Sequence, residues 1–429
     1  MDALVPIVVG LGYGDEGKGT TVDWLVRHYA AHTVVRFNGG AQAGHNVVLP
    51  DGRHHCFAQF GAGTFAGART HLSKYMLVNP IAAYSEASVL EDKGIADLAL
   101  TQLSCHEDAI VTTPFHVSMN RLRELARGDA RHGSCGMGIG ETVDGSHRDP
   151  QSTIRIRDLR DARALRRKLK RQQEIMVREQ LELPISSEDL GRSADYRVIV
   201  AHDTVERTEA IFQIFSDRIS IVDDDWVRAL LEQPGVVFEG AQGVLLDETF
   251  GFAPHNTWST CTFTNAMALL AGLDVQPLRL GVTRSFHTRH GAGPFVTERK
   301  DAPPLERDHN QPSKWQGNFR HGSLDLVALR YAVECVGGIE GLVMTWLDRF
   351  VYGDSYCTEY QIDFNRVDRI SQIEGDRTDV LFRARPRCDL YCGDGPQFFE
   401  SIASALHAEP ALMSFGPTYR DKTKHRGLR

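Results

Sequence analysis

Short apolar runs that stop at glycines or polar residues recur along this chain. Residues 4–10 are apolar and β-branched, which predicts a buried strand of a parallel sheet. After the next glycines, residues 20–30 have the spacing of a helix, and residues 32–37 (HTVVRF) again predict a strand. A strand, a glycine loop and a helix in this order indicate an α/β sheet.

Two later segments repeat the strand pattern. Residues 235–248 (GVVFEGAQGVLLDE) begin as an apolar strand and run into glycines, and residues 341–350 (GLVMTWLDRF) form another strand that leads to Asp348. In sheets of this class, ligands bind outside the carboxyl ends of the strands. We therefore expect the binding site where these polar residues follow their strands.

Two longer segments differ from this pattern. Residues 157–182 combine helical periodicity with dense charge, which predicts an exposed helix whose charges face solvent rather than a ligand. Residues 297–320 are rich in Pro, Asp, Asn, His and Gln with little periodicity. They predict a long loop, and long loops in enzymes often bind substrate or cover it.

Composition narrows the class of protein. The chain has 429 residues, of which 42% are apolar and 24% charged, so it can bury a large core. A formal net charge of −8 gives no reason to expect a nucleic-acid partner. The N-terminus lacks the positive charge of a signal peptide, and no segment approaches the roughly 18 apolar residues of a membrane span. We therefore expect a cytoplasmic enzyme that does not bind membranes.

The eight cysteines are scattered, without the paired short spacings of a zinc site. Cys388 and Cys392 are separated by about one helical turn, but two thiolates alone seldom hold a structural metal. We expect reduced thiols without a metal, as is usual in the cytosol.

The stretch GLGYGDEGKGTT (residues 10–21) has the spacing of a phosphate-binding loop. In such loops backbone N–H groups and a helix N-terminus hold the oxyanions, and a lysine, here Lys18, adds a positive charge. Gly19 replaces the hydroxyl residue that usually follows the lysine and binds Mg²⁺. Asp15, inside the loop, offers the carboxylate oxygen that Mg²⁺ prefers. Taken alone, the motif is also compatible with a glycine turn that binds no ligand.

A second glycine segment, RFNGGAQAGHNVV (residues 36–48), strengthens the case for a phosphate site. It follows a predicted strand and carries Gln42 and His45. A lone histidine is usually an ordinary surface or core residue, but His45 and Asp15 together form a candidate acid and base pair.

These two loops, with EGAQGVLLD and TRHGAGPFVTE, resemble the adenylosuccinate synthetase family from Val8 to about Arg420. The resemblance implies an α/β fold with a large, mostly parallel central sheet flanked by helices and a P-loop-like nucleotide site. It implies a single domain over residues 1–429 and a homodimer. It also implies that GTP, with Mg²⁺, phosphorylates the 6-oxygen of IMP, and that the aspartate amino group then displaces phosphate to give adenylosuccinate.

The resemblance assigns roles to residues of both loops. Asp15 would remove the N1 proton of the purine and bind Mg²⁺ together with Gly44, His45 would be the acid that assists transfer to O6, and Lys18 would neutralise the transferring phosphoryl group. The assignment is chemically reasonable, because a lactam oxygen is a poor nucleophile until the ring nitrogen loses its proton. The residues expected to contact the nucleotide phosphates are Gly14, Glu16, Gly17, Gly19 and Gly44.

Residues at two further strand ends resemble the guanine-reading segments of the family. A carboxylate such as that of Asp348 can accept hydrogen bonds from both N1–H and the 2-amino group of guanine. Trp346 stands where the family has lysine and is expected to stack on the base. The expected guanine contacts are Thr345, Asp348, Ser414 and Gly416. A structural role for Asp348, and ATP in place of GTP, remain open.

The acceptor pocket departs from the family pattern. Gln42 replaces an asparagine, and Cys135 in GSCGMG (residues 133–138) replaces a threonine that contacts phosphate. Arg148 lies about one position from the arginine expected to reach the nucleotide phosphate across the dimer interface. The residues expected to bind the acceptor nucleotide are Asn38, Gln42, Ser134, Cys135, Arg148, Gln242, Thr257 and Arg289.

The amino-acid pocket departs further. The family carries a run of arginines that clamps the two carboxylates of aspartate, whereas residues 314–325 keep only Arg320 and Lys314. We expect Arg320 to bind the amino acid, and a dicarboxylate to bind less tightly than in the family, because arginine is the residue that binds carboxylates bidentately.

Three functions remain open at this point. The leading one is a GTP-dependent ligase of small-molecule nucleotide and amino-acid substrates, with IMP and aspartate as the default pair. The second is a divergent ligase of specialised or phage-like nucleotide metabolism that acts on another purine nucleotide or amine. The third is a GTP-binding regulatory protein that has lost catalysis.

Overall fold

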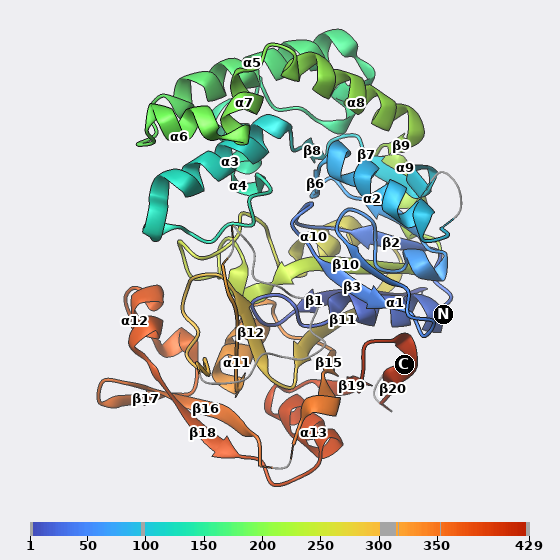
Figure 1. Ribbon diagram of the computed structural model, residues 1–429. Coiled ribbons are helices and arrows are strands. Elements are labelled where there is room, and N and C mark those ends of the chain that lie inside the picture. The colour runs from blue at the N-terminus through green and yellow to red at the C-terminus, as the bar shows by residue number, and fades with distance from the viewer. Residues whose placement is uncertain (1–2, 96–98, 301–314, 316, 352, 426–429) are drawn as a thin grey trace.

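The computed structural model describes residues 3–95, 99–300, 315, 317–351 and 353–425. A ten-stranded sheet crosses the centre of the molecule (Figure 1). Its neighbouring strands are parallel except for the last pair, β19 and β20, which is antiparallel. The expected α/β fold with a large, mostly parallel central sheet is confirmed. The strands are, in spatial order, β20 (Lys422–Lys424), β19 (Glu409–Ser414), β15 (Gly341–Thr345), β11 (Val275–Arg284), β1 (Ala3–Gly10), β10 (Val236–Gly243), β2 (Thr33–Arg36), β5 (Arg69–Leu72), β7 (Leu103–His106) and β9 (Ser220–Val222).

Both faces of this sheet are buried. In β1, Ile7 and Val9 pack into one hydrophobic core and Val8 into the other, and in β2 Val35 and Val34 divide in the same way. Because each strand buries both of its faces, it reads in the sequence as a continuous apolar run rather than as an alternation.

Helices cover the two cores. One core contains buried residues of α1 (Lys18–His28), α2 (Pro80–Asp92), α3 (Pro114–Arg127), α5 (Ala162–Gln180), α7 (Ala194–Val200) and α8 (Thr204–Arg218). The other contains buried residues of α9 (Asp224–Leu231), α10 (Thr264–Leu270), α11 (Leu326–Cys335), α12 (Arg377–Arg383) and α13 (Gly395–Ala405). The described residues form two further helices, α4 (Ile139–Arg148) and α6 (Ser187–Arg192). Within the described ranges, none of the helices has the length and apolar character needed to cross a membrane.

Four small sheets lie outside the central one. They pair β3 (His45–Val48) with β4 (His54–Phe57), β6 (Leu77–Val78) with β8 (Ile110–Val111), β12 (His287–His290) with β13 (Phe319–Gly322), and β14 (Leu324–Asp325) with β16 (Ser355–Ile362), which also pairs with β17 (Asn365–Val367) and β18 (Arg385–Leu390). In Figure 1 the helices α5 to α8 and the strands β16 to β18 lie at opposite ends of the molecule.

The strands expected at residues 4–10, 32–37, 235–248 and 341–350 are present as β1, β2, β10 and β15. The helix expected at residues 20–30 begins earlier, at Lys18, because Gly17 takes the left-handed conformation (φ 97°) that caps its start. The charged segment 157–182 forms a 3₁₀ turn, Ile156–Arg160, followed by α5. Its charges face solvent as expected, although α5 also buries Leu165, Leu169 and Met176 in the core.

Of two further expectations about local structure, one falls mostly outside the described residues and the other is wrong. Most of the loop expected at residues 297–320, including Lys314, lies outside the described residues, and the described end of it begins strand β13 at Phe319. The helical spacing of Cys388 and Cys392 was wrong, since Cys388 belongs to the extended strand β18. All eight cysteines are free thiols.

Candidate functional site

Many of the predicted site residues follow the carboxyl ends of five strands of the central sheet, β19, β15, β1, β10 and β2, with β11 between β15 and β1. The loop of residues 11–17 follows β1, the segment from Asn38 to His45 follows β2, and Gln242 lies at the end of β10. The strands β15 and β19 end at Thr345 and Ser414. All five strands are parallel, so these ends meet at one edge of the sheet, where sheets of this class bind their ligands.

The phosphate loop between β1 and α1 is already built around a carboxylate of its own. Glu16 accepts hydrogen bonds from the backbone N–H groups of Gly12 (3.0 Å) and Gly14 (2.7 Å), and Lys18 Nζ lies 2.7 Å from Glu16 Oε2. Both charged side chains are buried. The Glu16 side chain therefore organises the loop from inside, whereas its expected role was contact with the nucleotide phosphates.

Asp15 has a left-handed backbone, with φ of 63°. Its Oδ2 lies 3.2 Å from Nε2 of His290, and its carbonyl oxygen accepts a hydrogen bond from Arg284 Nε. Burial raises the pKa of Asp15, but the hydrogen bond and charge of His290, with smaller contributions from Arg284 and Lys18, outweigh it, and the net pKa is lowered. Asp15 is therefore ionised at neutral pH.

His45, on β3, is held by a carboxylate that the sequence reasoning did not assign. Its Nδ1 donates a hydrogen bond to Glu239 of β10, whose other oxygen accepts from the backbone N–H of Ala62 at 2.9 Å. Burial raises the pKa of Glu239, but the charges of Arg36 and His45 outweigh burial and lower it. Burial lowers the pKa of His45 even though Glu239 opposes the change. Since Nδ1 is engaged, Nε2 is the ring nitrogen left for a ligand.

Two cavities meet at these residues. A large cavity of about 930 Å³ lies on one side and a small one of about 160 Å³ on the other. Five residues line both cavities: Asp15, Lys18, Gly44, His45 and Asn46. The three predicted catalytic residues are thus the shared boundary of two binding spaces.

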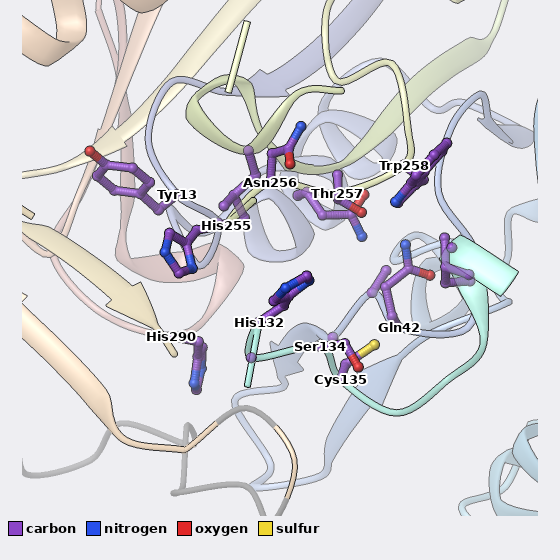
Figure 2. A pocket seen from close by; sticks show the side chains of 18 of the residues that line it. Tyr13, Gln42, His132, Ser134, Cys135, His255, Asn256, Thr257, Trp258 and His290 are labelled. Carbon is purple, nitrogen blue, oxygen red and sulfur yellow. The ribbon is translucent and has the colours of Figure 1, made fainter. Parts of the chain in front are cut away.

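The large cavity contains two amide side chains with unused hydrogen-bonding capacity. Within the described part of the chain, Gln42 Nε2 and Oε1 and Gln242 Oε1 are buried without a hydrogen-bond partner. Figure 2 shows Gln42 projecting into the cavity, with Thr257 and Trp258 on the neighbouring loop. A buried amide without a partner is costly, so these atoms are suited to a polar ligand.

Arg289, expected to bind the acceptor, is buried in the wall of the large cavity. Its guanidinium donates to the carbonyl oxygens of Ala292 (3.1 Å), Pro294 (2.8 Å) and His255 (2.9 Å), and it lies 4.3 Å from the ring centroid of Tyr13. Burial lowers the pKa of Arg289 to about 10. Its donors are largely used by the protein itself, so Arg289 shapes the cavity by bridging two loops.

Residues of α3, α4 and the glycine loop between them form another wall of the large cavity. Ser134 Oγ donates to Asn120 Oδ1 at 3.2 Å, and burial raises the pKa of the Cys135 thiol to about 11, so the thiol is protonated. Arg148 forms ion pairs with Asp144 (2.6 Å) and Glu179 (2.5 Å) of the same chain. Its charge is neutralised there.

Two residues expected at the site lie apart from it. Asn38 bonds to the backbone of Ala241 through both ends of its amide (3.1 and 2.7 Å), and thereby joins β10 to the loop after β2. Arg320 pairs with Glu298 (3.0 Å) and donates to the Gly293 carbonyl (3.0 Å). In the part of the chain that the structure describes, neither residue is among those lining the two cavities.

The small cavity combines the phosphate loop with the residues expected to read guanine. Thr345 donates its hydroxyl to the Glu16 carbonyl (2.6 Å), which fixes the loop to the end of β15, and Ser414 donates to the Gly416 carbonyl (3.1 Å). Asp348 is exposed at the rim, in the 3₁₀ turn Leu347–Arg349. Trp346 lines the cavity and has the Arg284 guanidinium 4.9 Å from its ring centroid.

The residues at the junction of the cavities fit a magnesium ion shared with phosphates. Among the described residues, no three His, Cys, Asp or Glu side chains are grouped so as to hold a metal. Mg²⁺ does not need such a group, since it is usually bound through one or two carboxylates, waters and substrate phosphates. Asp15 supplies an ionised carboxylate at this junction and Gly44 lines the same two cavities, so both are available to such a site.

The sequence reasoning missed Glu239, His290 and Arg284. Glu239 and His290 both lie in motifs that carry the family resemblance, EGAQGVLLD and TRHGAGPFVTE. Their hydrogen-bond partners could not be predicted from the sequence, because each contact joins segments far apart in the chain: Glu239 to His45, and His290 and Arg284 to Asp15. An acid inside an otherwise apolar and buried strand, as Glu239 is in β10, was the one local signal available.

Known proteins of one family are similar to this chain over most of its length. A family model described as adenylosuccinate synthetase matches residues 7–384. An adenylosuccinate synthetase of Burkholderia pseudomallei (strain 668) is 32% identical over 387 residues, covering 84% of this chain and 80% of the relative. One from Burkholderia thailandensis is 32% identical over 385 residues, with the same coverage.

Two solved structures share the fold. A fully ligated adenylosuccinate synthetase from Plasmodium falciparum superimposes with a TM-score of 0.78 at 20% identity, covering 98% of this chain and all (100%) of that one. A succinoaminodeoxyadenylate synthetase from cyanophage S-2L, bound to dGMP and to dATP as an energy donor, gives a TM-score of 0.58 at 15% identity, covering 99% and 96%. At such identities the likeness establishes the fold and leaves the substrates open.

Proposed function

Because this chain belongs to the adenylosuccinate synthetase family, we propose that it is a GTP-dependent ligase that joins an amino acid to position 6 of a purine nucleotide. In the default reaction, IMP, L-aspartate and GTP give adenylosuccinate, GDP and phosphate. The 6-oxygen of the purine leaves as phosphate after it has taken the terminal phosphoryl group of GTP.

The observation that carries this proposal is the shared boundary of the two cavities. Asp15, Lys18 and His45 line both of them, so a donor in the small cavity and an acceptor in the large one would meet at these three side chains. Direct transfer of a phosphoryl group between two bound molecules needs this arrangement, with the reacting atoms held in contact by the walls of both sites.

Each of the three side chains has a task at this boundary. Ionised Asp15 would take the N1 proton of the purine, which shifts electron density to O6 and makes it a nucleophile. Lys18 would neutralise charge on the transferring phosphoryl group. His45, oriented by Glu239, would donate a proton or hydrogen bond from Nε2 to the developing phosphate.

His45 is a proton donor at Nε2 only in its doubly protonated form, since Nδ1 already donates to Glu239. Burial lowers the pKa of His45 in the empty protein, so this form is the minor one at neutral pH. The negative charge of bound phosphates would raise that pKa and favour the form that donates. Mg²⁺, held by Asp15 and Gly44 together with the donor phosphates, would supply further positive charge at the phosphoryl group.

A second candidate, a ligase with another purine acceptor or another amine, is favoured by the state of the two arginines. Arg148 is paired with two carboxylates of its own chain, and Arg320 is paired with Glu298 outside the lining of the large cavity among the described residues. The default substrates therefore find few cationic side chains for the acceptor phosphate and for the two carboxylates of aspartate. The cyanophage relative, bound to dGMP, makes GMP and dGMP the first alternatives to IMP.

A mass-spectrometric product screen tests these candidates together. The protein would be incubated with Mg²⁺, GTP or ATP, one of IMP, GMP, dIMP and dGMP, and a mixture of amino acids. We expect phosphate release that depends on one acceptor, and a product whose mass equals acceptor plus amine minus water. The Asp15→Asn protein is the control. Tight nucleotide binding without acceptor-dependent phosphate release would favour the third candidate, a regulatory GTP-binding protein.

Four further properties complete the proposal: the donor, the domain organisation, the location and the oligomeric state. We propose that GTP rather than ATP is the donor, because Asp348 stands at the rim of the small cavity, where one carboxylate can bind both N–H donors of guanine. We also propose that the chain acts as one domain in a cytoplasmic homodimer, in which Arg148 can leave its own carboxylates and reach the partner's acceptor. A donor competition assay and a molecular-mass measurement in solution test these points.

A further inference from the structure

Two cysteines lie directly opposite each other on neighbouring antiparallel strands of a small sheet outside the central one. Cys357 of β16 and Cys388 of β18 are register partners. Opposite residues in an antiparallel pair have Cα atoms about 4.5 or about 5.5 Å apart, and a disulfide needs about 4.4–6.8 Å. Either type of pair therefore meets the backbone requirement for a disulfide.

The two sulfur atoms also face each other. The Cys357 thiol is hydrogen-bonded to the sulfur of Cys388, which places both side chains on the same face of the sheet. Cys357 Sγ also lies 3.2 Å from the Glu359 carbonyl oxygen. The strand register therefore brings the two thiols together on one face of the small sheet.

The environments of the two thiols differ in the way that a peroxide-reactive pair requires. Cys388 is exposed, and the hydrogen bond from Cys357 lowers its pKa below the ordinary value. Cys357 is fully buried, and its hydrogen bond to Cys388 together with burial raises its pKa. An accessible thiolate is the form that reacts with peroxide, and a neighbouring thiol is what resolves the product.

We propose that Cys357 and Cys388 form a modification site at which hydrogen peroxide produces a disulfide. The Cys388 thiolate attacks peroxide, the O–O bond breaks, and Cys388 becomes a sulfenic acid as hydroxide leaves. The Cys357 sulfur then attacks the Cys388 sulfur, the S–O bond breaks, and water leaves as the S–S bond forms. Two thiols lose two electrons and two protons in total, and peroxide is reduced to water.

This site is separate from the proposed ligase reaction. Among the described residues, neither cysteine lines the large or the small cavity. Cys357 is also the register partner of Asp325 in the short strand β14, and Asp325 caps α11 and accepts a hydrogen bond from the Tyr360 hydroxyl at 2.6 Å. Oxidation would therefore tie β18 to β16 without closing either binding space.

The test is peroxide treatment of the reduced full-length protein, followed by alkylation of free thiols and peptide mass mapping without reduction. We expect a peptide pair joined through Cys357 and Cys388, lighter by two hydrogen atoms than the sum of its parts. Dithiothreitol should remove the link. Cys388→Ser should abolish it, whereas Cys392→Ser, which removes another exposed cysteine four residues away in the sequence, should leave it unchanged.

Three outcomes would overturn the proposal. One is a Cys388–Cys392 disulfide in place of the expected pair. Another is irreversible oxidation of Cys388 to sulfinic or sulfonic acid while Cys357 remains alkylatable. The last is recovery of both Cys357 and Cys388 as alkylated free thiols after peroxide treatment. Since the readout is covalent and does not use ligase activity, it is informative whether or not the proposed function holds.

Discussion

Asp15 is the side chain on which the proposed chemistry depends most. Replacing it with asparagine removes the charge and the proton acceptor but keeps the size. We expect acceptor-dependent phosphate release to fall by about 10²–10⁴-fold, the usual contribution of a general base. Nucleotide binding by the small cavity in the absence of Mg²⁺ should persist, since Lys18, Thr345 and Asp348 are unchanged. Steady-state phosphate release and equilibrium binding measure the two effects.

Asp51→Asn is the matched control, because Asp51 is an exposed aspartate that pairs only locally, with Arg53. It should leave both activity and binding at the wild-type level. Asp15→Asn protein that turned over at the wild-type rate would remove the basis for the assigned mechanism.

Glu239 should set the pH range in which His45 works. The catalytic form of His45 is protonated, so it is present below its pKa and is lost as pH rises through that value. Burial lowers the pKa of His45 and the Glu239 charge raises it. Glu239→Gln removes the negative charge that raises the pKa of His45. The alkaline limb of the rate profile should therefore move to lower pH, with the largest loss of activity on the alkaline side of neutrality.

The measurement is kcat/KM as a function of pH for the wild-type and Glu239→Gln proteins. Glu86→Gln is the control, because Glu86 is another buried glutamate next to a histidine, His55, and neither residue lines the cavities within the described ranges. An unshifted profile in Glu239→Gln would show that Glu239 does not act through His45.

The sequence predicted the catalytic residues better than their partners. Asp15, Lys18 and His45 stand in short glycine motifs whose spacing is itself informative. Glu239 and His290 act through contacts between segments far apart in the chain, which no local pattern encodes. Asn38 was expected in the acceptor site from the family resemblance, whereas its amide bonds to the backbone of Ala241.

At the scale of elements, the turn from β1 into α1 makes a specific demand on Gly17. Its φ is 97°, and a Cβ atom there would lie 2.9 Å from Thr345 Cγ2. Gly17→Ala should therefore both strain the backbone and push the loop away from β15. We expect nucleotide affinity to fall by at least about tenfold, with a loss of stability of about 1–2 kcal/mol from the left-handed backbone.

Gly14→Ala separates these two effects. Gly14 also has a left-handed backbone (φ 94°), but a Cβ there would meet nothing within 4 Å. The variant should show a similar loss of thermal stability with a smaller loss of nucleotide affinity. Equal loss of affinity in both variants, measured by titration calorimetry, would contradict a specific role for the contact with Thr345.

Among the elements, the buried strands were the most predictable. Val5 to Val9 are apolar because both faces of β1 are covered, and such runs have few alternative structures. The start of α1 was set two residues too late because a left-handed glycine cap has no periodicity to read. The pairing of Cys357 with Cys388 depends on the register between β16 and β18, which only the folded sheet defines.

At the scale of the whole molecule, the position of Arg148 bears on assembly. In one protomer it is neutralised by Asp144 and Glu179. If it serves the partner's acceptor site in a homodimer, Arg148→Ala and Asp15→Asn should each be inactive alone. Equal mixtures should recover roughly a quarter of wild-type activity, because half of the dimers are mixed and each carries one intact site.

The complementation needs a parallel mass measurement, by sedimentation or light scattering, to show that subunits exchange. A mixture of Asp15→Asn with Glu239→Gln should give no recovery, since both changes affect the same protomer's site. If dimers of Arg148→Ala and Asp15→Asn that are known to have exchanged subunits recovered no activity, Arg148 would act only within its own chain.

The internal carboxylate of the phosphate loop also affects how nucleotide arrives. Glu16 accepts hydrogen bonds from the backbone N–H groups of Gly12 and Gly14 before any ligand is present, so these two groups have a partner in the empty protein. A nucleoside triphosphate would then bind to a phosphate loop whose conformation is already formed, without a slow conformational step. Stopped-flow fluorescence of Trp346, at the edge of the small cavity, should accordingly record one exponential phase whose rate rises linearly with nucleotide concentration.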